Sequence, residues 1–327
     1  MSPPTDFASR LGPVVVQHLA LKLALGCGCQ GERRVLVHLD RFLAAHDADL
    51  TAETFTPWCA AIAQLTPQVR RRWMGVVRAL SLYRQRTEPG CFVPDLSTFP
   101  QPLPSQRAYL FTDEDIVRLL RAADALGPAS TSPLHRAVFR LAIVVLHTAG
   151  LRRRELIRLT LGDYDPVAKT LAIRASKYHK SRLVPLSSDA AREMEAFLVA
   201  RRQLAHSVEA PLLCNSRHGV RAYTGAGLAQ GLRQLFRQAG VRTATGALPR
   251  VHDLRHTFAH AALLRWYRAG VDVQARLPAL SIYMGHVSIA STQHYLAHFE
   301  PFAEAASERF ARHCEPFLGR EPEGGGR

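Results

Sequence analysis

The sequence predicts a mainly α-helical protein of two domains, a small N-terminal helical bundle and a larger α+β domain with a small antiparallel sheet. Apolar residues recur near the 3.6-residue period of a helix through much of the 327-residue chain. A proline-rich stretch interrupts this pattern, and two short strand-like runs follow later, Thr170–Arg174 and Arg182–Leu186. We therefore expect domains at residues 1–88 and 108–316, a linker at 89–107, and a disordered tail at 317–327.

Helices fill the first domain. Glu32–Ala45 repeats apolar residues at a helical period, and Thr51 offers the N-cap of a further helix. Thr66 followed by Pro67 is a start signal for a helix that runs to about Arg84. Its inward face should carry Val69, Trp73, Val76, Val77 and Leu80. Its other face carries four arginines, which the sequence leaves open as either a solvated or a DNA-facing surface: Arg70, Arg71, Arg72 and Arg78.

The second domain should begin with a helix capped by Thr112, because acidic residues fill its first turn. An apolar helix over about Pro133–His147 should be fully buried and should end before Gly150. A third helix starts near Arg152. The two strand-like runs form a hairpin whose turn contains Lys177 and Lys180. Further helices are expected at Asp189–Leu204, Gly227–Ala239, His252–Tyr267 and Ala303–His313.

The chain is strongly basic. It has 42 Lys and Arg against 27 Asp and Glu, a net charge of +15. Most of the excess lies in residues 107–316, which hold 29 basic and 17 acidic residues. Such a balance indicates that the partner is a nucleic acid or another anionic surface.

Other classes of protein are disfavoured. No apolar run reaches the roughly 20 residues of a membrane-spanning helix, and the first residues lack the basic and apolar regions of a signal peptide. The six cysteines are scattered, and Cys27 and Cys29 have no second pair at zinc-ligand spacing. We therefore expect a cytoplasmic protein with free thiols, no metal site and no cofactor.

One stretch after residue 250 gathers groups that suit chemistry on a phosphodiester. His252 and Arg255 lie three residues apart, so they share a face of the expected helix. The spacing alone carries little information, because the sequence contains four such His-x-x-Arg pairs. Leu254 and Phe258, with Ala261 one turn further on, distinguish this pair, because they mark a buried side of the helix beside it.

Five polar motifs follow one another along the second domain. They are Gly150-Leu-Arg152-x-x-Glu155-Leu, Lys177 in a hairpin before Arg182-Leu-Val-Pro-Leu186, His252-x-Leu-Arg255-His-Thr-Phe-Ala, Gly285-His286, and Tyr295. In this order they resemble the tyrosine recombinase (phage integrase) family. The resemblance covers about Phe111–Tyr295 and extends more weakly to residues 12–85. It implies a SAM-like core-binding domain followed by a catalytic domain of the DNA breaking-rejoining enzyme fold.

The resemblance also implies a mechanism. Tyr295 would attack a DNA phosphate and form a 3′-phosphotyrosyl bond, with neither metal nor ATP. His252 would act as general base, and Lys177 would protonate the departing 5′ oxygen. The residues that bind the nonbridging oxygens would be Arg152, Arg255 and His286.

Several alternatives stay open. Lys180 competes with Lys177 for the role of acid, and by residue type alone Tyr283 could replace Tyr295. The 31 residues from Arg255 to His286 exceed the family's usual interval and resemble members carried by transposons or plasmids. The whole chain could instead be a type IB topoisomerase-like relaxase, or a DNA-binding regulator without activity.

The partners follow from the resemblance as well. The substrate would be double-stranded DNA with paired recombination half-sites, bound by one dimer per site and by a homo-tetramer at synapsis. The expected helix Ala303–His313 could pack on a neighbouring protomer or on its own domain.

Overall fold

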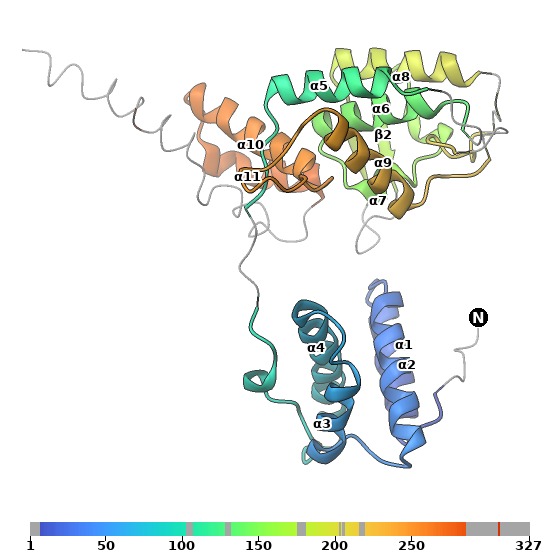
Figure 1. Ribbon diagram of the computed structural model, residues 1–327, viewed down its shortest axis with the longest axis vertical. Coiled ribbons are helices and arrows are strands. Elements are labelled where there is room, and N and C mark those ends of the chain that lie inside the picture. The colour runs from blue at the N-terminus through green and yellow to red at the C-terminus, as the bar shows by residue number, and fades with distance from the viewer. Residues whose placement is uncertain are drawn as a thin grey trace, which may run out of the picture. The chain divides into compact units, whose positions relative to one another are not determined.

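The structure is a computed structural model that describes residues 7–102, 107–127, 132–174, 181–202, 204, 207–215, 220–285 and 307. The described part is mostly helical with a small antiparallel sheet, which confirms the expected fold class (Figure 1). It forms two compact units, one up to residue 106 and one from residue 107. The expected tail 317–327 lies outside the described residues, and so does Ala303–His313 apart from Ser307.

The first unit is built from α1–α4 and a short 3₁₀ turn. Their bounds are Gly12–Ala24 (α1), Gln30–Ala45 (α2), Ala52–Ala61 (α3), Pro67–Arg84 (α4) and Leu96–Thr98 (η1). Helix α2 packs against α1, α3 and α4, and its apolar face meets Trp58, which is completely buried. Thr51 caps α3 as predicted, because its hydroxyl accepts the Thr54 amide at 3.4 Å. Thr66 precedes α4 but makes no side-chain cap hydrogen bond.

The inward face of α4 agrees with the expected one except at Val69. Val77 and Leu80 are buried, and Trp73 and Val76 pack partly buried against the same core. Val69 is exposed, whereas Met74 and Ser81 are buried in addition. Two arginines of this helix turn toward the chain that follows it.

The first part of the chain that follows α4 packs on the first unit. Phe99 belongs to the buried core of the unit, with 5% of its surface exposed. Arg71 donates from Nη1 to the Pro100 carbonyl at 2.7 Å, and Arg78 donates to the Pro94 carbonyl. The proline-rich stretch cannot form a regular helix, so its carbonyls need donors from elsewhere, and these two arginines supply them.

The second unit combines helices with a small sheet. Its described elements are α5 (Asp113–Asp124), α6 (His135–Thr148), α7 (Arg153–Leu156), η2 (Leu161–Asp163), β1 (Tyr164–Asp165), β2 (Thr170–Ile173), β3 (Arg182–Pro185), α8 (Ser188–Arg201), α9 (Gly225–Gln238), α10 (Asp253–Arg268) and α11 (Val273–Met284). Thr112 caps α5 through a reciprocal pair of hydrogen bonds with Asp115, as predicted. None of the helices in the described ranges is long and apolar enough to cross a bilayer.

The predicted hairpin is present in its two strands. Strand β2 pairs antiparallel with β3, with Ile173 opposite Arg182 and Leu171 opposite Val184, and β1 adds to the other edge of β2. Side chains alternate between the faces of a strand, so Arg182 points to the same face as the buried Val184. The turn with Lys177 and Lys180 lies outside the described residues.

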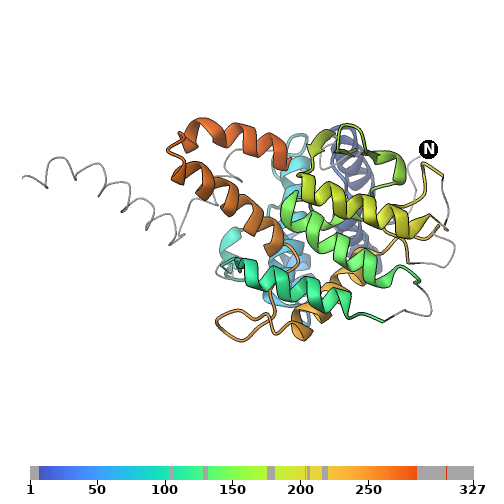
Figure 2. The same cartoon turned by 90° about the horizontal axis from the view of Figure 1, so that it is seen from above.

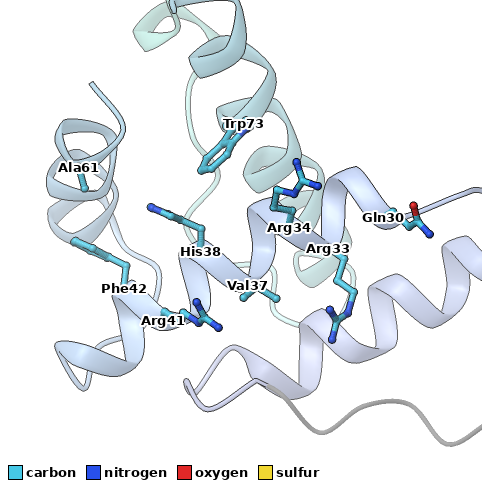
Figure 3. A pocket seen from close by; sticks show the side chains of 9 residues that line it. All are labelled: Gln30, Arg33, Arg34, Val37, His38, Arg41, Phe42, Ala61 and Trp73. Atoms are coloured by element: carbon cyan, nitrogen blue, oxygen red, sulfur yellow. The ribbon is translucent and has the colours of Figure 1, made fainter. Parts of the chain in front are cut away.

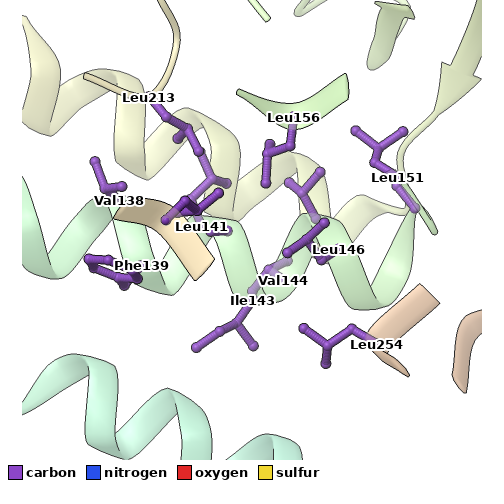
Figure 4. Close-up of a cluster of buried hydrophobic side chains, with 14 of the residues drawn as sticks. Val138, Phe139, Leu141, Ile143, Val144, Leu146, Leu151, Leu156, Leu213 and Leu254 are labelled. Carbon is purple, nitrogen blue, oxygen red and sulfur yellow. The ribbon is translucent and has the colours of Figure 1, made fainter. Parts of the chain in front are cut away.

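Helix α6 forms the centre of the second unit. It packs against α5, α8, α9 and α10, and Figures 1 and 2 show α5 and α8 running alongside it. Its side chains from Val138 to Leu146 are almost all buried, which confirms the predicted core helix (Figure 4). The core of the unit is therefore arranged around the helix that ends just before Gly150.

Helices α10 and α11 form a hairpin with a small core of their own. This core contains Ala259, Leu263, Leu277, Leu280 and Met284. Ala261, expected on the buried side, is exposed instead. The Asp272 carboxylate caps α11 by accepting the Gln274 amide at 2.9 Å. The long interval from Arg255 to His286 thus contains most of α10 and the whole of α11.

Candidate active site

The C-terminal end of α11 is surrounded by arginine side chains from distant parts of the second unit. Three arginines each donate one hydrogen bond to one of three successive backbone carbonyls there: Arg182 Nε to Tyr283 (2.7 Å), Arg255 Nη2 to Met284 (2.6 Å) and Arg152 Nη2 to Gly285 (2.7 Å). The last carbonyls of a helix have no partner inside it, and they lie at the negative end of the helix dipole. Guanidinium groups are therefore well suited to this position. We call the backbone carbonyls of Tyr283, Met284 and Gly285 the carbonyl triplet.

Glu155 lies between the same three arginines. Its carboxylate accepts both Nη groups of Arg182 at 3.0 Å and Nη1 of Arg152 at 2.8 Å, and Arg255 Nη1 lies 3.9 Å away. Burial alone would raise the pKa of Glu155, but the hydrogen bonds from Arg182 and from the Arg152 amide outweigh burial and lower the pKa to about 2. Glu155 is therefore a buried anion at neutral pH, and it orients Arg152.

Gly150 makes the turn that brings Arg152 to this cluster. Its φ of +58° lies in the left-handed region, and a Cβ here would lie 2.4 Å from a ring carbon of Phe258. Its carbonyl accepts Nη1 of Arg255 at 2.6 Å. Only glycine combines this backbone conformation with this close approach, so the end of α6 and the start of α10 are joined at Gly150.

Gly285 has a similar role at the end of α11. It is the left-handed C-cap of the helix, with a φ of 65°. A Cβ at this position would lie 2.7 Å from Arg182 Nη1 and 3.4 Å from Arg152 Nη1. The absence of a side chain thus leaves room for the two guanidinium groups.

His252 and Arg255 occupy different environments although they begin the same helix. Arg255 is 1% exposed, whereas His252 lies at the surface, at the N-cap position of α10. Surrounding protein atoms still displace water from the imidazole, and this desolvation together with the charge of Arg255 lowers the pKa of His252 to about 4. The imidazole is therefore neutral at physiological pH, the state that a general base requires.

The described residues bring together three of the six expected site residues, Arg152, His252 and Arg255. The other three, Lys177, His286 and Tyr295, lie outside the described residues, as does Lys180. His286 directly follows Gly285 in the sequence. The described cluster therefore ends at Gly285, the residue before His286.

The alternative nucleophile Tyr283 is described, and it is committed to packing. Its ring stacks on Phe258 with centroids 5.4 Å apart and planes at 20°. Its hydroxyl points to the Pro185 carbonyl at 3.5 Å, and burial raises its pKa. A phenol with a raised pKa is a weaker nucleophile at neutral pH.

Arg182 is the member of the cluster that sequence reasoning did not identify. The sequence predicts for Arg182 only a place at the start of a strand. A usable signal was present, because alternation along β3 places Arg182 on the same face as Val184. An arginine on the inward face of a strand needs a buried acceptor, and Glu155 is that acceptor.

The cluster carries an excess of positive charge. Three guanidinium groups share the Glu155 carboxylate, and the side chain of Arg152 remains 26% exposed. Such an arrangement can bind an oxyanion and stabilise additional negative charge that develops on it. No group of three or more potential metal ligands occurs among the residues that the structure covers.

Comparison with known proteins places the sequence in a family. Residues 110–300 match the model of the phage integrase family. An integrase/recombinase of Sinorhizobium fredii is 34% identical over 92% of this chain and 97% of its own length. The tyrosine recombinase XerD of Mycobacterium tuberculosis is 33% identical over 59% of this chain and 58% of its own length.

Solved structures share the fold. The integrase of the Tn1549 transposon, in complex with a circular intermediate DNA, has a TM-score of 0.63 at 18% identity and covers 90% of this chain and 99% of that one. The XerH recombinase bound to its difH substrate has a TM-score of 0.56 at 19% identity and covers 84% of this chain and 76% of that one. At these identities the likeness is one of fold.

Proposed function

The chain belongs to the phage integrase family, the tyrosine recombinases that carry out site-specific DNA recombination, and we propose how its residues divide that reaction. Arg152 and Arg255, with His286, bind the nonbridging oxygens of the scissile phosphate. The observation that carries this assignment is the arginine cluster at the carbonyl triplet, which ends one residue before His286. The excess charge of the cluster suits a phosphate whose negative charge grows in the transition state.

The proposed chemistry is a transesterification. The Tyr295 hydroxyl attacks phosphorus while His252 accepts its proton, and a 3′-phosphotyrosyl bond forms. The bond from phosphorus to the 5′ oxygen breaks, and Lys177 protonates that oxygen as it leaves. In the rejoining step a 5′ hydroxyl attacks the phosphotyrosyl bond and releases Tyr295. The bond energy is retained throughout, so the balance needs no nucleotide hydrolysis.

Two properties of the described residues support this division. The lowered pKa of His252 keeps its imidazole able to accept a proton at neutral pH. Tyr283 is held by stacking and by the Pro185 carbonyl, which favours Tyr295 as the nucleophile.

A covalent complex is the result that tests the proposal. A duplex is first selected from a random-sequence pool by binding to the full chain. Versions of it are then prepared with a nick at successive positions. Cleavage close to the nick releases a short strand that diffuses away, so the covalent complex cannot rejoin. We call this substrate the selected duplex. A protein–DNA adduct that survives detergent, formed with EDTA and without ATP, is expected. Binding without an adduct at any nick position would favour the regulator without activity.

The relaxase alternative is separated by its product. With supercoiled plasmids that contain two copies of the selected sequence, we expect recombinant circles or inversions. Relaxation that needs one copy, with no recombinants from two copies, would instead indicate topoisomerase-like action on a single duplex.

Replacement of Lys177 is expected to block cleavage at protonation of the leaving group. Lys177→Ala should cleave the selected duplex roughly 10²- to 10⁴-fold more slowly than the wild type. A 5′-bridging phosphorothiolate at the cleavage point should restore the rate, because a thiolate leaves without protonation. Lys180→Ala is the matched control and should need no such rescue. Rescue of Lys180→Ala in place of Lys177→Ala would transfer the acid role to Lys180.

We propose that the first unit contacts DNA through a groove on α2. The groove has a volume of about 840 Å³ and a floor that includes Phe42 and Trp73 (Figure 3). Basic side chains of α2 line it, Arg33, Arg34 and Arg41. His38 accepts Trp58 Nε1 on Nδ1 at 3.1 Å, and burial together with the charge of Arg41 lowers its pKa. Arginines around a polar and aromatic floor suit a DNA backbone.

This groove revises the expected arginine face of α4. Arg71 and Arg78 bind carbonyls of their own unit, so they are poor candidates for DNA contacts. Arg72 stays in the proposal, because its guanidinium lies next to the start of α2, where a Cβ on Gly31 would be 3.3 Å from it. Arg70 also stays a candidate on the same helix.

The groove arginines should act through phosphate contacts. Arg33→Gln and Arg41→Gln should each weaken binding of the selected duplex, and each should lower the slope of log Kd against log salt by about one. Arg10→Gln is the matched control, because Arg10 is an exposed arginine of the same unit that pairs with Asp47. Unchanged salt slopes for both groove variants would remove this groove from the DNA interface.

We further propose a dimer on each site and a tetramer at synapsis, with the work done at the nucleoid in the bacterial cytoplasm. Support comes from the need for four strand cleavages in a complete exchange between two duplexes. Mass measurement of the complex with the selected duplex would distinguish a tetramer from a dimer.

A further inference from the structure

We infer that Arg182 is a positioning residue for strand cleavage, which holds the Glu155 carboxylate that orients Arg152 and bonds the helix end that carries the second acceptor of Arg152. The inference rests on the proposed role of Arg152 as a phosphate ligand. It assigns a function to a residue that contacts neither the phosphate nor the reacting atoms.

The contacts of Arg182 define what it positions. Its two Nη groups each bond one oxygen of Glu155 at 3.0 Å, and its Nε bonds the Tyr283 carbonyl at 2.7 Å. These are the carboxylate that holds Arg152 and the carbonyl two residues before the one that holds Arg152. Arg182 therefore bonds one anchor of the Arg152 guanidinium, Glu155, and also bonds the end of α11, which carries the other anchor, the Gly285 carbonyl.

The Arg182 side chain is less accessible than that of Arg152. Its side chain is 9% exposed, compared with 26% for Arg152. All three of its nitrogens already donate to acceptors within the unit. Gly285 also closes over it, since a Cβ there would lie 2.7 Å from Nη1 and 3.1 Å from Cζ. The guanidinium is thus enclosed between β3, α7 and the end of α11.

The shape of the guanidinium explains why arginine is needed. Its planar fork bonds both carboxylate oxygens while Nε, which lies in the same plane, reaches a third acceptor. A lysine at this position keeps the charge but presents a single nitrogen, which cannot make three such bonds together. Glu155 would then lose the two-pronged bond that fixes the plane of its carboxylate, and the guanidinium of Arg152 would shift with it. A displacement of about 1 Å at a reacting site can cost on the order of 100-fold in rate.

Arg182 links the hairpin to the end of α11. It lies five residues after Lys177 in the hairpin, and it bonds the residue three before His286. The separation in sequence between Arg182 and Tyr283 is 101 residues. One side chain therefore connects the strand of the hairpin to the end of α11.

A double-mutant cycle tests the inference. Single-turnover adduct formation on the selected duplex is measured for the wild type, Arg182→Lys, Arg152→Lys and the double variant, together with Kd for the same duplex. Arg182→Lys should lower the cleavage rate roughly 10- to 100-fold and change Kd by less than about threefold. The double variant should match Arg152→Lys within about twofold, because Arg182 acts through Arg152. Arg192→Lys, on an exposed pair with Asp189, is the control and should behave as wild type.

The outcomes separate this inference from the proposed function. If Arg152→Lys cleaves at the wild-type rate, the role of Arg152 is wrong and the positioning role of Arg182 falls with it. A second outcome is that Arg152→Lys is slow and that Arg182→Lys lowers its rate further, by the same factor by which it lowers the wild-type rate. That outcome overturns the positioning role of Arg182 and leaves the role of Arg152 intact. Arg182→Gln replaces Arg182→Lys if the latter does not fold. Loss of folding in both variants also overturns the inference, because Arg182 would then be required for the fold itself.

Discussion

Replacing Tyr295 by phenylalanine is expected to abolish covalent attachment to DNA while leaving DNA affinity within about threefold of the wild type. The change removes one oxygen, and that oxygen is the atom proposed to bond phosphorus. Phenylalanine has no oxygen to take its place, so the rate of adduct formation should fall by more than about 1,000-fold. The measurement is the denaturing-gel adduct on the selected duplex, with Kd determined in parallel.

Tyr283→Phe is the control for this experiment. The Tyr283 hydroxyl makes one long contact, 3.5 Å to the Pro185 carbonyl, and the stacking of its ring on Phe258 does not need the oxygen. Cleavage by Tyr283→Phe should therefore remain within a few-fold of wild type. An adduct that persists in Tyr295→Phe and disappears in Tyr283→Phe would reverse the assignment of the nucleophile.

Glu155→Gln is expected to destabilise the protein by about 3–5 kcal/mol in urea denaturation at pH 7. The amide cannot accept a hydrogen bond from both Nη groups of Arg182, and it leaves buried positive charge on Arg182 and Arg255 without its anion. Removal of one partner of a buried ion pair typically costs this much. Glu193→Gln is the matched control, since Glu193 accepts a two-pronged bond from Arg140 on partly exposed side chains. It should cost under about 1 kcal/mol.

The difference between wild type and Glu155→Gln should depend on pH. The pKa of Glu155 is about 2 in the folded protein, below the roughly 4.3 of a free glutamate. A depressed pKa contributes stability that is fully present above the unfolded value and is lost as the pH falls toward the folded value. The gap between the two proteins should therefore be constant above about pH 5 and narrow toward pH 2. A gap that stays constant down to pH 2 would show that the charge of Glu155 is not its source.

Local signals in the sequence were sufficient for the helices and for part of the site. The caps at Thr51 and Thr112 and the apolar run of α6 depend on neighbouring residues, and each is present as predicted. The link from Glu155 to Arg152 spans three residues on one helical turn, so it could also be inferred. These features depend on periodicity and capping, which a single sequence contains.

Features that depend on distant contacts were beyond such reasoning. Arg71 and Arg78 of α4 bind carbonyls 29 and 16 residues away, and no local pattern indicated these bonds. The carbonyl triplet joins Arg152 to Gly285 across 133 residues, and no local pattern encodes that pairing. Helix α11 contains Pro278 and has no one-sided apolar face, so its period gave a weak signal. Packing against α10 and β3, together with its caps Asp272 and Gly285, determines it.

The crowding of charge around Gly285 has a consequence for engineering. Four positions, 152, 155, 182 and 285, occupy one tightly filled volume, and a change at any of them alters the space or the charge available to the others. Random libraries that vary these positions one at a time will therefore return mostly inactive proteins, and useful variants will need paired changes. Retargeting of the protein to new DNA sequences should keep all four fixed and should diversify the first unit, whose groove is separate from them in the chain.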